Sequence, residues 1–90
     1  MKKKLSILFF VLACGVSYSQ SGVGTTTPHA SAALDVTSTN KGLLLPRMTT
    51  AQRNAIPTPT PGLMIYNTTT NCVEFRNNTG WYNVCTGTTN

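Results

Sequence analysis

The chain has 90 residues, of which 10% are charged and 40% apolar, and its formal net charge is +5 at pH 7. This length has room for at most one small domain. Three of the seven basic residues are Lys2–Lys4, so the chain after residue 19 keeps four basic residues against Asp35 and Glu74, a net charge of +2. The sequence thus lacks a basic stripe that would track phosphates, which argues against a nucleic-acid partner. One histidine and two acids are too few for a triad, a metal cage or a carboxylate pair, so we expect no enzyme activity, cofactor or metal site.

Residues 1–19 have the pattern of a signal peptide. The basic Lys2–Lys4 precedes Leu5–Val16, an apolar run of 12 residues that only Ser6 and Gly15 interrupt. A spanning helix needs roughly 20 apolar residues, so this run is too short to cross a membrane and fits a signal helix. Small residues then stand just before Gln20. We therefore expect cleavage before Gln20, a secreted or cell-surface protein, and no membrane span after the signal is removed.

An alternative interpretation concerns Cys14. The segment Val11–Cys14 resembles a bacterial lipoprotein box, in which Cys14 would be lipidated and would anchor the protein in the outer membrane. Leu12 stands where a small residue is usual, so the pattern favours ordinary secretion. In both cases Cys72 and Cys85 remain as an even pair outside the cytoplasm, where disulfides persist.

The chain after the signal is predicted to be all-β and mostly extended. Threonine occurs 16 times, always after residue 24, and asparagine occurs eight times. Threonine favours extended structure and asparagine favours turns. We expect residues 20–61 to form an extended Thr- and Pro-rich segment with one short strand at residues 33–37. One short helix is expected at residues 50–56, where Thr49 and Gln52 have the spacing of a capping box.

Residues 62–85 are predicted to form a three-stranded antiparallel meander. The strand candidates are Gly62–Tyr66, Cys72–Arg76 and Trp81–Cys85, with Asn- and Thr-rich turns between them. The five residues that follow, 86–90, are expected to be a disordered tail.

The hydrophobic pattern predicts the register of this meander. The second hairpin pairs Arg76 with Trp81, Phe75 with Tyr82, and Cys72 with Cys85, which brings the two cysteines within disulfide range. The first hairpin is expected to pair Tyr66 with Cys72 and Ile65 with Val73. One face of the sheet would then be apolar. Its members are Leu63, Ile65, Val73, Phe75, Tyr82 and Val84.

The opposite face is the candidate ligand or interface face. Its members are Met64, Tyr66, Glu74, Arg76, Trp81 and Asn83. Trp81 and Arg76 face each other in this register and are expected to stack as a cation–π pair. Three interpretations stay open: an interface with another subunit or domain, a carbohydrate platform on Trp81 and Tyr66, or an indole that shields its own hairpin.

Four segments together resemble a known type of module. They read GVGTTTPHASAALDV, KGLLLPRMTTAQRNAI, PGLMIYNTTTN and NNTGWY, and they span residues 22–85. This succession resembles modules of secreted Bacteroidetes-type surface proteins and of tailed-phage fibres. The resemblance implies elongated, intertwined β-structured trimers that precede a larger receptor-binding, collagen-like or chaperone domain. It implies a structural or adhesive role and supplies no catalytic residue.

The small apolar content predicts a homo-oligomer. Ordering the roughly 71 residues after the signal costs on the order of 100 kcal/mol of conformational entropy. Offsetting that cost at about 25 cal/mol per Å² requires roughly 4,000 Å² of apolar burial. A lone meander would leave Leu43–Leu45 and one sheet face exposed to water, and it would leave the backbone groups of two edge strands unpaired. We expect a homotrimer, with the number three taken from the resemblance, and a surface glycan or a larger fibre domain as further partners.

Overall fold

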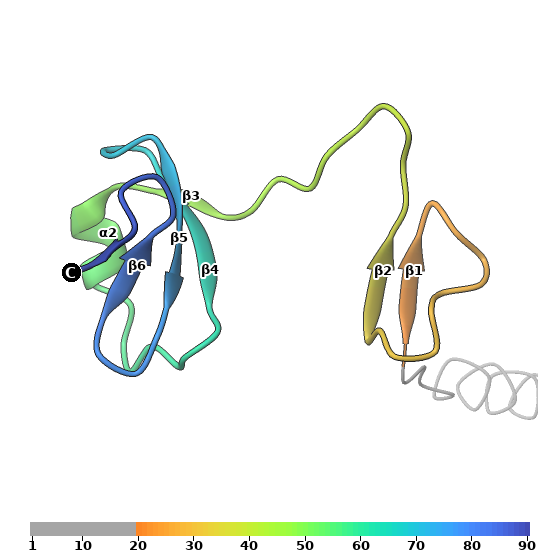
Figure 1. Cartoon of the computed structure of the whole chain (residues 1–90), viewed down its shortest axis with the longest axis horizontal. Helices are drawn as coiled ribbons and strands as arrows, with labels where there is room; N and C mark the ends of the chain where they lie inside the picture. The colour runs from red at the N-terminus through yellow and green to blue at the C-terminus, as the bar shows by residue number, and fades with distance from the viewer. Residues whose placement is uncertain (1–19) are drawn as a thin grey trace, which may run out of the picture. The chain divides into compact units, whose positions relative to one another are not determined.

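The computed structural model describes residues 20–90 (Figure 1). The expected signal helix over residues 1–19 and the alternative lipidation at Cys14 lie outside the described residues. The chain divides into two compact units, Met1–Gly42 and Leu43–Asn90. The described part consists mostly of short strands with one short helix, so the predicted all-β class is confirmed. None of its helices is long and apolar enough to cross a membrane.

The first unit contains two parallel strands, β1 (Ser21–Val23) and β2 (Leu34–Val36). β2 matches the strand predicted at residues 33–37, whereas β1 was not predicted. The loop between them is held by polar contacts. The Asp35 carboxylate accepts a hydrogen bond from the backbone N–H of His29 at 2.8 Å, and the Gln20 side chain donates to the carbonyl of Ala30 at 2.7 Å.

Gly24 allows the chain to leave β1. Its φ of +77° lies in the left-handed region, and a Cβ at this position would collide with the backbone oxygen of Thr37. The backbone N–H of Thr37 also donates to the carbonyl of Val23 at 2.8 Å. Only glycine accommodates both the dihedral angle and this close approach.

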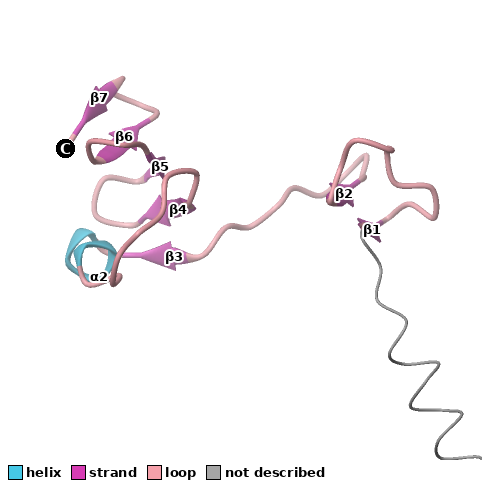
Figure 2. Cartoon of the chain, turned by 90° about the horizontal axis from the view of Figure 1, so that it is seen from below, coloured by secondary structure: helices cyan, strands magenta, loops and turns pink. Residues whose placement is uncertain are grey.

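The second unit is a five-stranded sheet in the order β3-β4-β5-β6-β7 (Figures 1 and 2). Its strands are β3 (Arg47–Met48), β4 (Met64–Asn67), β5 (Cys72–Arg76), β6 (Trp81–Asn83) and β7 (Thr88–Thr89). β3 runs parallel to β4, and the other neighbours are antiparallel. The predicted meander is β4–β5–β6, and the sheet extends beyond it by one strand at each edge.

The predicted disordered tail at residues 86–90 is wrong. Gly87, with a φ of +69°, turns the chain back, and β7 pairs with β6. Asn90 then exchanges two backbone hydrogen bonds with Trp81, each 2.8 Å long. These bonds satisfy an edge that the expected three-stranded meander would have left open.

The helix α2 (Thr50–Asn54) has the capping box that the sequence predicts. The Thr49 hydroxyl accepts from the backbone N–H of Gln52 at 3.2 Å, and the Gln52 side chain accepts from the backbone N–H of Thr49 at 2.9 Å. The helix ends at Asn54, two residues before the expected end. Ala55 is its C-cap, and Pro57 follows shortly after, where a helix cannot easily continue.

The two hairpins of the meander differ in how well the sequence predicts them. In the second, Arg76 pairs with Trp81 and Phe75 pairs with Tyr82, as predicted. The predicted disulfide between Cys72 and Cys85 is also present, with a Cα–Cα distance of 6.0 Å.

The predicted register of the first hairpin is wrong by one residue. Tyr66 pairs with Val73, and Asn67 takes the place opposite Cys72. The strand therefore includes Asn67, whose side-chain oxygen accepts from the backbone N–H of Thr69 at 2.9 Å and closes the turn. This shift turns every side chain of β4 to the other face of the sheet.

Asparagine side chains close three turns of the second unit in the same way. Each asparagine ends or follows a strand, and its side-chain oxygen accepts from backbone N–H groups two and three residues later. The three residues are Asn67, Asn77 and Asn83. The asparagine content of the sequence is therefore used to set the turns, as its composition predicts.

Candidate functional site

The face of the sheet that α2 covers, here called the inner face, is buried and largely polar. Its side chains are Ile65, Asn67, Cys72, Glu74, Trp81 and Asn83. Glu74 and Asn67 are the largest fully buried side chains in the described residues. Burying a carboxylate is costly unless it is paired and hydrogen-bonded, so its contacts determine whether this face is stable.

Glu74 is held by four side-chain donors. Its Oε1 accepts from Arg53 Nη1 at 2.8 Å and from Asn67 Nδ2 at 2.9 Å. Its Oε2 accepts from Asn83 Nδ2 at 2.9 Å and from the Thr70 hydroxyl at 3.4 Å. One carboxylate on the central strand therefore ties α2 to the turns on both sides of that strand.

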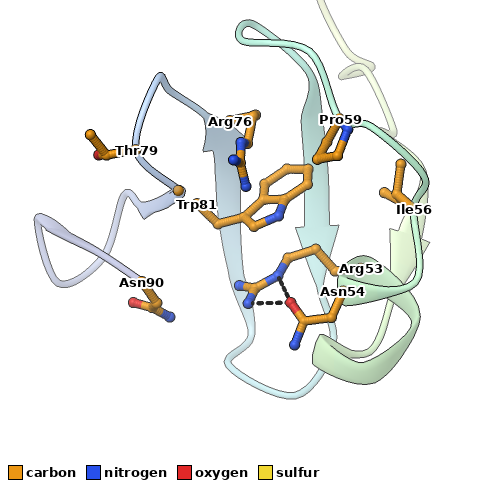
Figure 3. Close-up of a pocket in the computed structure, with 9 residues that line it drawn as sticks. Arg53, Asn54, Ile56, Pro59, Arg76, Thr79, Trp81 and Asn90 are labelled. Atoms are coloured by element: carbon orange, nitrogen blue, oxygen red, sulfur yellow. Dashed lines mark hydrogen bonds between the residues drawn. The ribbon is translucent and has the colours of Figure 1, made fainter.

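Arg53 completes the ion pair from the helix. Its side chain is 5% exposed, and its Nε and Nη2 donate to Asn54 Oδ1 at 3.2 and 2.9 Å (Figure 3). The guanidinium carbon lies 5.5 Å from the centre of the Trp81 ring, within cation–π range. The expected stacking of Trp81 on Arg76 is therefore wrong, because α2 brings Arg53 over the indole.

The surroundings of Glu74 favour its charged form. Burial by itself would raise the pKa of Glu74. The hydrogen bonds from Asn67, Arg53 and Asn83, together with the positive charge of Arg53, outweigh burial and lower the pKa below its ordinary value. Glu74 is thus a structural anion, because its oxygens are occupied and none of its surface is exposed.

A cavity of about 540 Å³ lies beside Trp81 (Figure 3). Its lining includes Arg53, Ile56, Pro59, Arg76, Thr79 and Trp81. The Nε of Arg76 is buried there and has no hydrogen-bond acceptor among residues 20–90. The lining carries hydrogen-bond donors and an indole, and it includes no aspartate or glutamate side chain.

The opposite face of the sheet, here called the outer face, is apolar and is not covered by α2. Its side chains are Met64, Tyr66, Val73, Phe75 and Tyr82. Met64 is 50% exposed, the other four are half-buried, and the rings of Phe75 and Tyr82 lie 4.9 Å apart. The two rings therefore pack on each other across β5 and β6.

The predicted ligand or interface face is therefore divided between two faces. Met64 and Tyr66 lie on the outer face, whereas Arg76 and Trp81 lie on the inner face. Trp81 is only 3% exposed. The predicted carbohydrate platform on Trp81 and Tyr66 is thus wrong, because the sheet separates the two rings and the indole is buried.

The sequence reasoning missed the polar interior. Arg53 and Asn67 were not identified as partners of Glu74, whereas the predicted register had already placed Asn83 opposite it. One signal was available: Glu74 lies between the apolar Val73 and Phe75 in a strand candidate, and a buried strand tolerates an acid only when it is paired. The partner could not be named from this signal, because Arg53 is 21 residues away and its position depends on where α2 docks.

The described residues contain no group of three or more metal-ligating side chains. His29, the one histidine, accepts from or donates to the Ser31 hydroxyl at 2.8 Å through its Nδ1. Its partner there is a neighbouring serine of the same loop.

The second unit is thus all-β, with a closed polar interior and an apolar outer face. A family model described as the phage tail-like trimerisation region matches residues 22–90, and the chain belongs to this family. Family membership supports a tail-fibre-like structural module that forms a homo-oligomer. No curated protein and no solved structure matches the chain.

Proposed function

We propose that this chain is a homotrimerising structural module of an exported, fibre-like adhesive protein, and that it has no catalytic activity. The family match supports the trimeric state. The observation that carries the proposal is the first unit, where no residue of 20–42 is buried.

This first unit needs partners to be stable. Its two strands have three residues each, and Val23 and Leu34 are more than half exposed. An isolated pair of strands is marginal in water, because it has too little apolar surface to bury. Further copies of the same chain would supply that surface and would pair with the open edges of β1 and β2.

The segment that joins the two units also needs partner chains to cover its apolar side chains. Leu43 and Leu44 are 65% and 68% exposed, although they belong to a run of three leucines. Burial of leucine contributes about 1.5–3 kcal/mol per side chain, so three chains that cover this run gain substantial stability.

The proposal is tested by measuring the mass of the native assembly. The full chain is expressed with its own export signal, purified, and analysed by size-exclusion chromatography with light scattering. The expected mass is that of three chains, and the melting temperature should rise with protein concentration. A one-chain mass at micromolar concentration, with a melting temperature independent of concentration, would contradict it.

Export is tested on the same material. We expect the intact mass to correspond to a chain that begins at Gln20, and we expect the protein outside the cytoplasm. A mass with an acylated Cys14 would replace secretion by lipid anchoring. A retained Met1 would exclude both forms of processing.

A further inference from the structure

We propose that the outer face of the sheet is the surface through which the three copies pack on one another. The inference rests on the proposed function, and it places the contact between copies on one side of β4, β5 and β6. The occupant of this face is a second copy of the chain.

The distribution of polarity is the first argument. In an antiparallel sheet with one solvated face, the apolar side chains normally point to the core and the polar ones to water. Here the inner face carries Glu74 with Asn67 and Asn83, whereas Phe75 and Tyr82 point outward. This arrangement is inverted for a monomer. It becomes ordinary when the outer face is buried by assembly.

The chemistry of the face is the second argument. Three of its five side chains are aromatic and a fourth is Met64, the residue types that are enriched at the centre of protein interfaces. Arg47 pairs with Tyr66 from the edge strand β3 and adds a cation at the rim. The uncharged centre can meet an identical surface without placing like charges together.

The geometry of a closed trimer is the third argument. Three copies around one axis can each present the same sheet face to that axis, so a single apolar surface serves both neighbours. The inner face cannot play this role, because α2 and the Arg53–Glu74 ion pair already occupy it. The outer face is therefore the sheet surface that remains for other copies.

The experiment places a charge on the outer face of the full-length exported chain. Met64→Lys is the test variant, because Met64 is half exposed and a lysine there can reach water in a monomer. Leu63→Lys is the matched control, since Leu63 is the adjacent residue and its side chain points to the other side of the sheet. Both variants are checked for the Cys72–Cys85 disulfide and for Trp81 fluorescence, which report the folded unit.

We expect Met64→Lys to lose the three-chain species at micromolar concentration, while Leu63→Lys keeps it. If the wild type is trimeric and Met64→Lys remains trimeric, the inference falls and the proposed function stands. If the wild type is monomeric, the inference and the proposed function are both contradicted. If the wild type is trimeric and both variants become monomeric, the assignment to the outer face is overturned.

A cross-linking measurement covers the case in which Met64→Lys fails to fold. Met64→Cys near a threefold axis should give a disulfide-linked dimer band on a non-reducing gel, and Leu63→Cys should not. Equal cross-linking of both variants, or cross-linking of Leu63→Cys alone, would also overturn the assignment.

Discussion

Four side-chain donors hold Glu74, and this makes it sensitive to substitution. Glu74→Gln keeps the shape of the side chain but leaves Arg53 buried without an opposite charge. Removal of one partner of a buried ion pair costs about 3–5 kcal/mol, so we expect a loss of that order in the free energy of unfolding. Urea unfolding at fixed protein concentration measures it.

Asp35→Asn is the control for this prediction. Asp35 is the other acid of the chain, and it is half-exposed, so neutralising it changes the net charge equally without leaving a buried cation. A loss in Asp35→Asn as large as that in Glu74→Gln would contradict the importance of the buried pair.

The lowered pKa of Glu74 predicts how stability depends on pH. The folded state holds the carboxylate charged, whereas an unfolded glutamate has a pKa of about 4.3. The stabilisation is therefore complete above about pH 4.3 and is lost as the pH falls through the lower pKa of the folded state. We expect the difference in unfolding free energy between wild type and Glu74→Gln to shrink with falling pH. A difference that is constant from pH 7 to the acid limb would refute this.

Arg53 and Arg76 are expected to differ sharply although both contact the Trp81 cavity. Arg53 is paired with Glu74 and donates a hydrogen bond from each of its three guanidinium nitrogens, whereas Arg76 Nε has no acceptor in the described chain. Arg53→Met should lower the free energy of unfolding by about 3–5 kcal/mol, since it leaves the buried Glu74 carboxylate without an opposite charge. Arg76→Met should stay within about 0.5 kcal/mol of wild type, because it removes no bonded group. Thermal unfolding of the two variants side by side separates them.

At the scale of the elements, the disulfide clamps the central hairpin. Cys72 and Cys85 are 13 residues apart in sequence, and closing a loop of this length contributes on the order of 3 kcal/mol through the entropy of the unfolded chain. The double variant Cys72→Ser/Cys85→Ser should lose stability by this amount and should keep the β5–β6 register. Urea unfolding measures the loss, and reduced wild type serves as the control. A double variant as stable as the oxidised wild type would contradict the prediction.

The elements that the sequence predicts correctly are those set by neighbouring residues. The capping box needs only Thr49 and Gln52, and the second hairpin needs only its short Asn-rich turn and the facing cysteines. The first hairpin was predicted from the rule that apolar side chains share the buried face. That rule fails here because the buried face is polar, so Ile65 was grouped with Val73 although they lie on opposite sides.

The remaining features depend on contacts between distant elements. Arg53 reaches Glu74 only because α2 docks on the sheet. Likewise, β3 pairs with β4 although α2 separates the two strands in the sequence. β7 was missed because its two threonines carry no apolar alternation. Such contacts have no local signature in the sequence, so composition and periodicity cannot locate them.

At the scale of the whole molecule, the two units place different demands on assembly. Residues 43–90 have a buried interior of their own and a disulfide, whereas residues 20–42 have no buried residue. The second unit can therefore fold within one chain. In the proposed trimer the first unit gains its apolar contacts from neighbouring copies, so its order should depend on protein concentration.

The strand order of the second unit has a consequence for kinetics. Every strand from β3 to β7 pairs with the next one along the chain, so most contacts join residues close in sequence. Chains with such local contacts cross their folding barrier quickly, whereas meeting of subunits is a slower step whose rate depends on concentration. After dilution from denaturant, with the disulfide intact, Trp81 fluorescence should recover in a fast phase that is independent of concentration. Light scattering should then rise in a second phase that quickens as more chain is added, so the frequency of encounters between folded chains sets how soon the fibre module is complete.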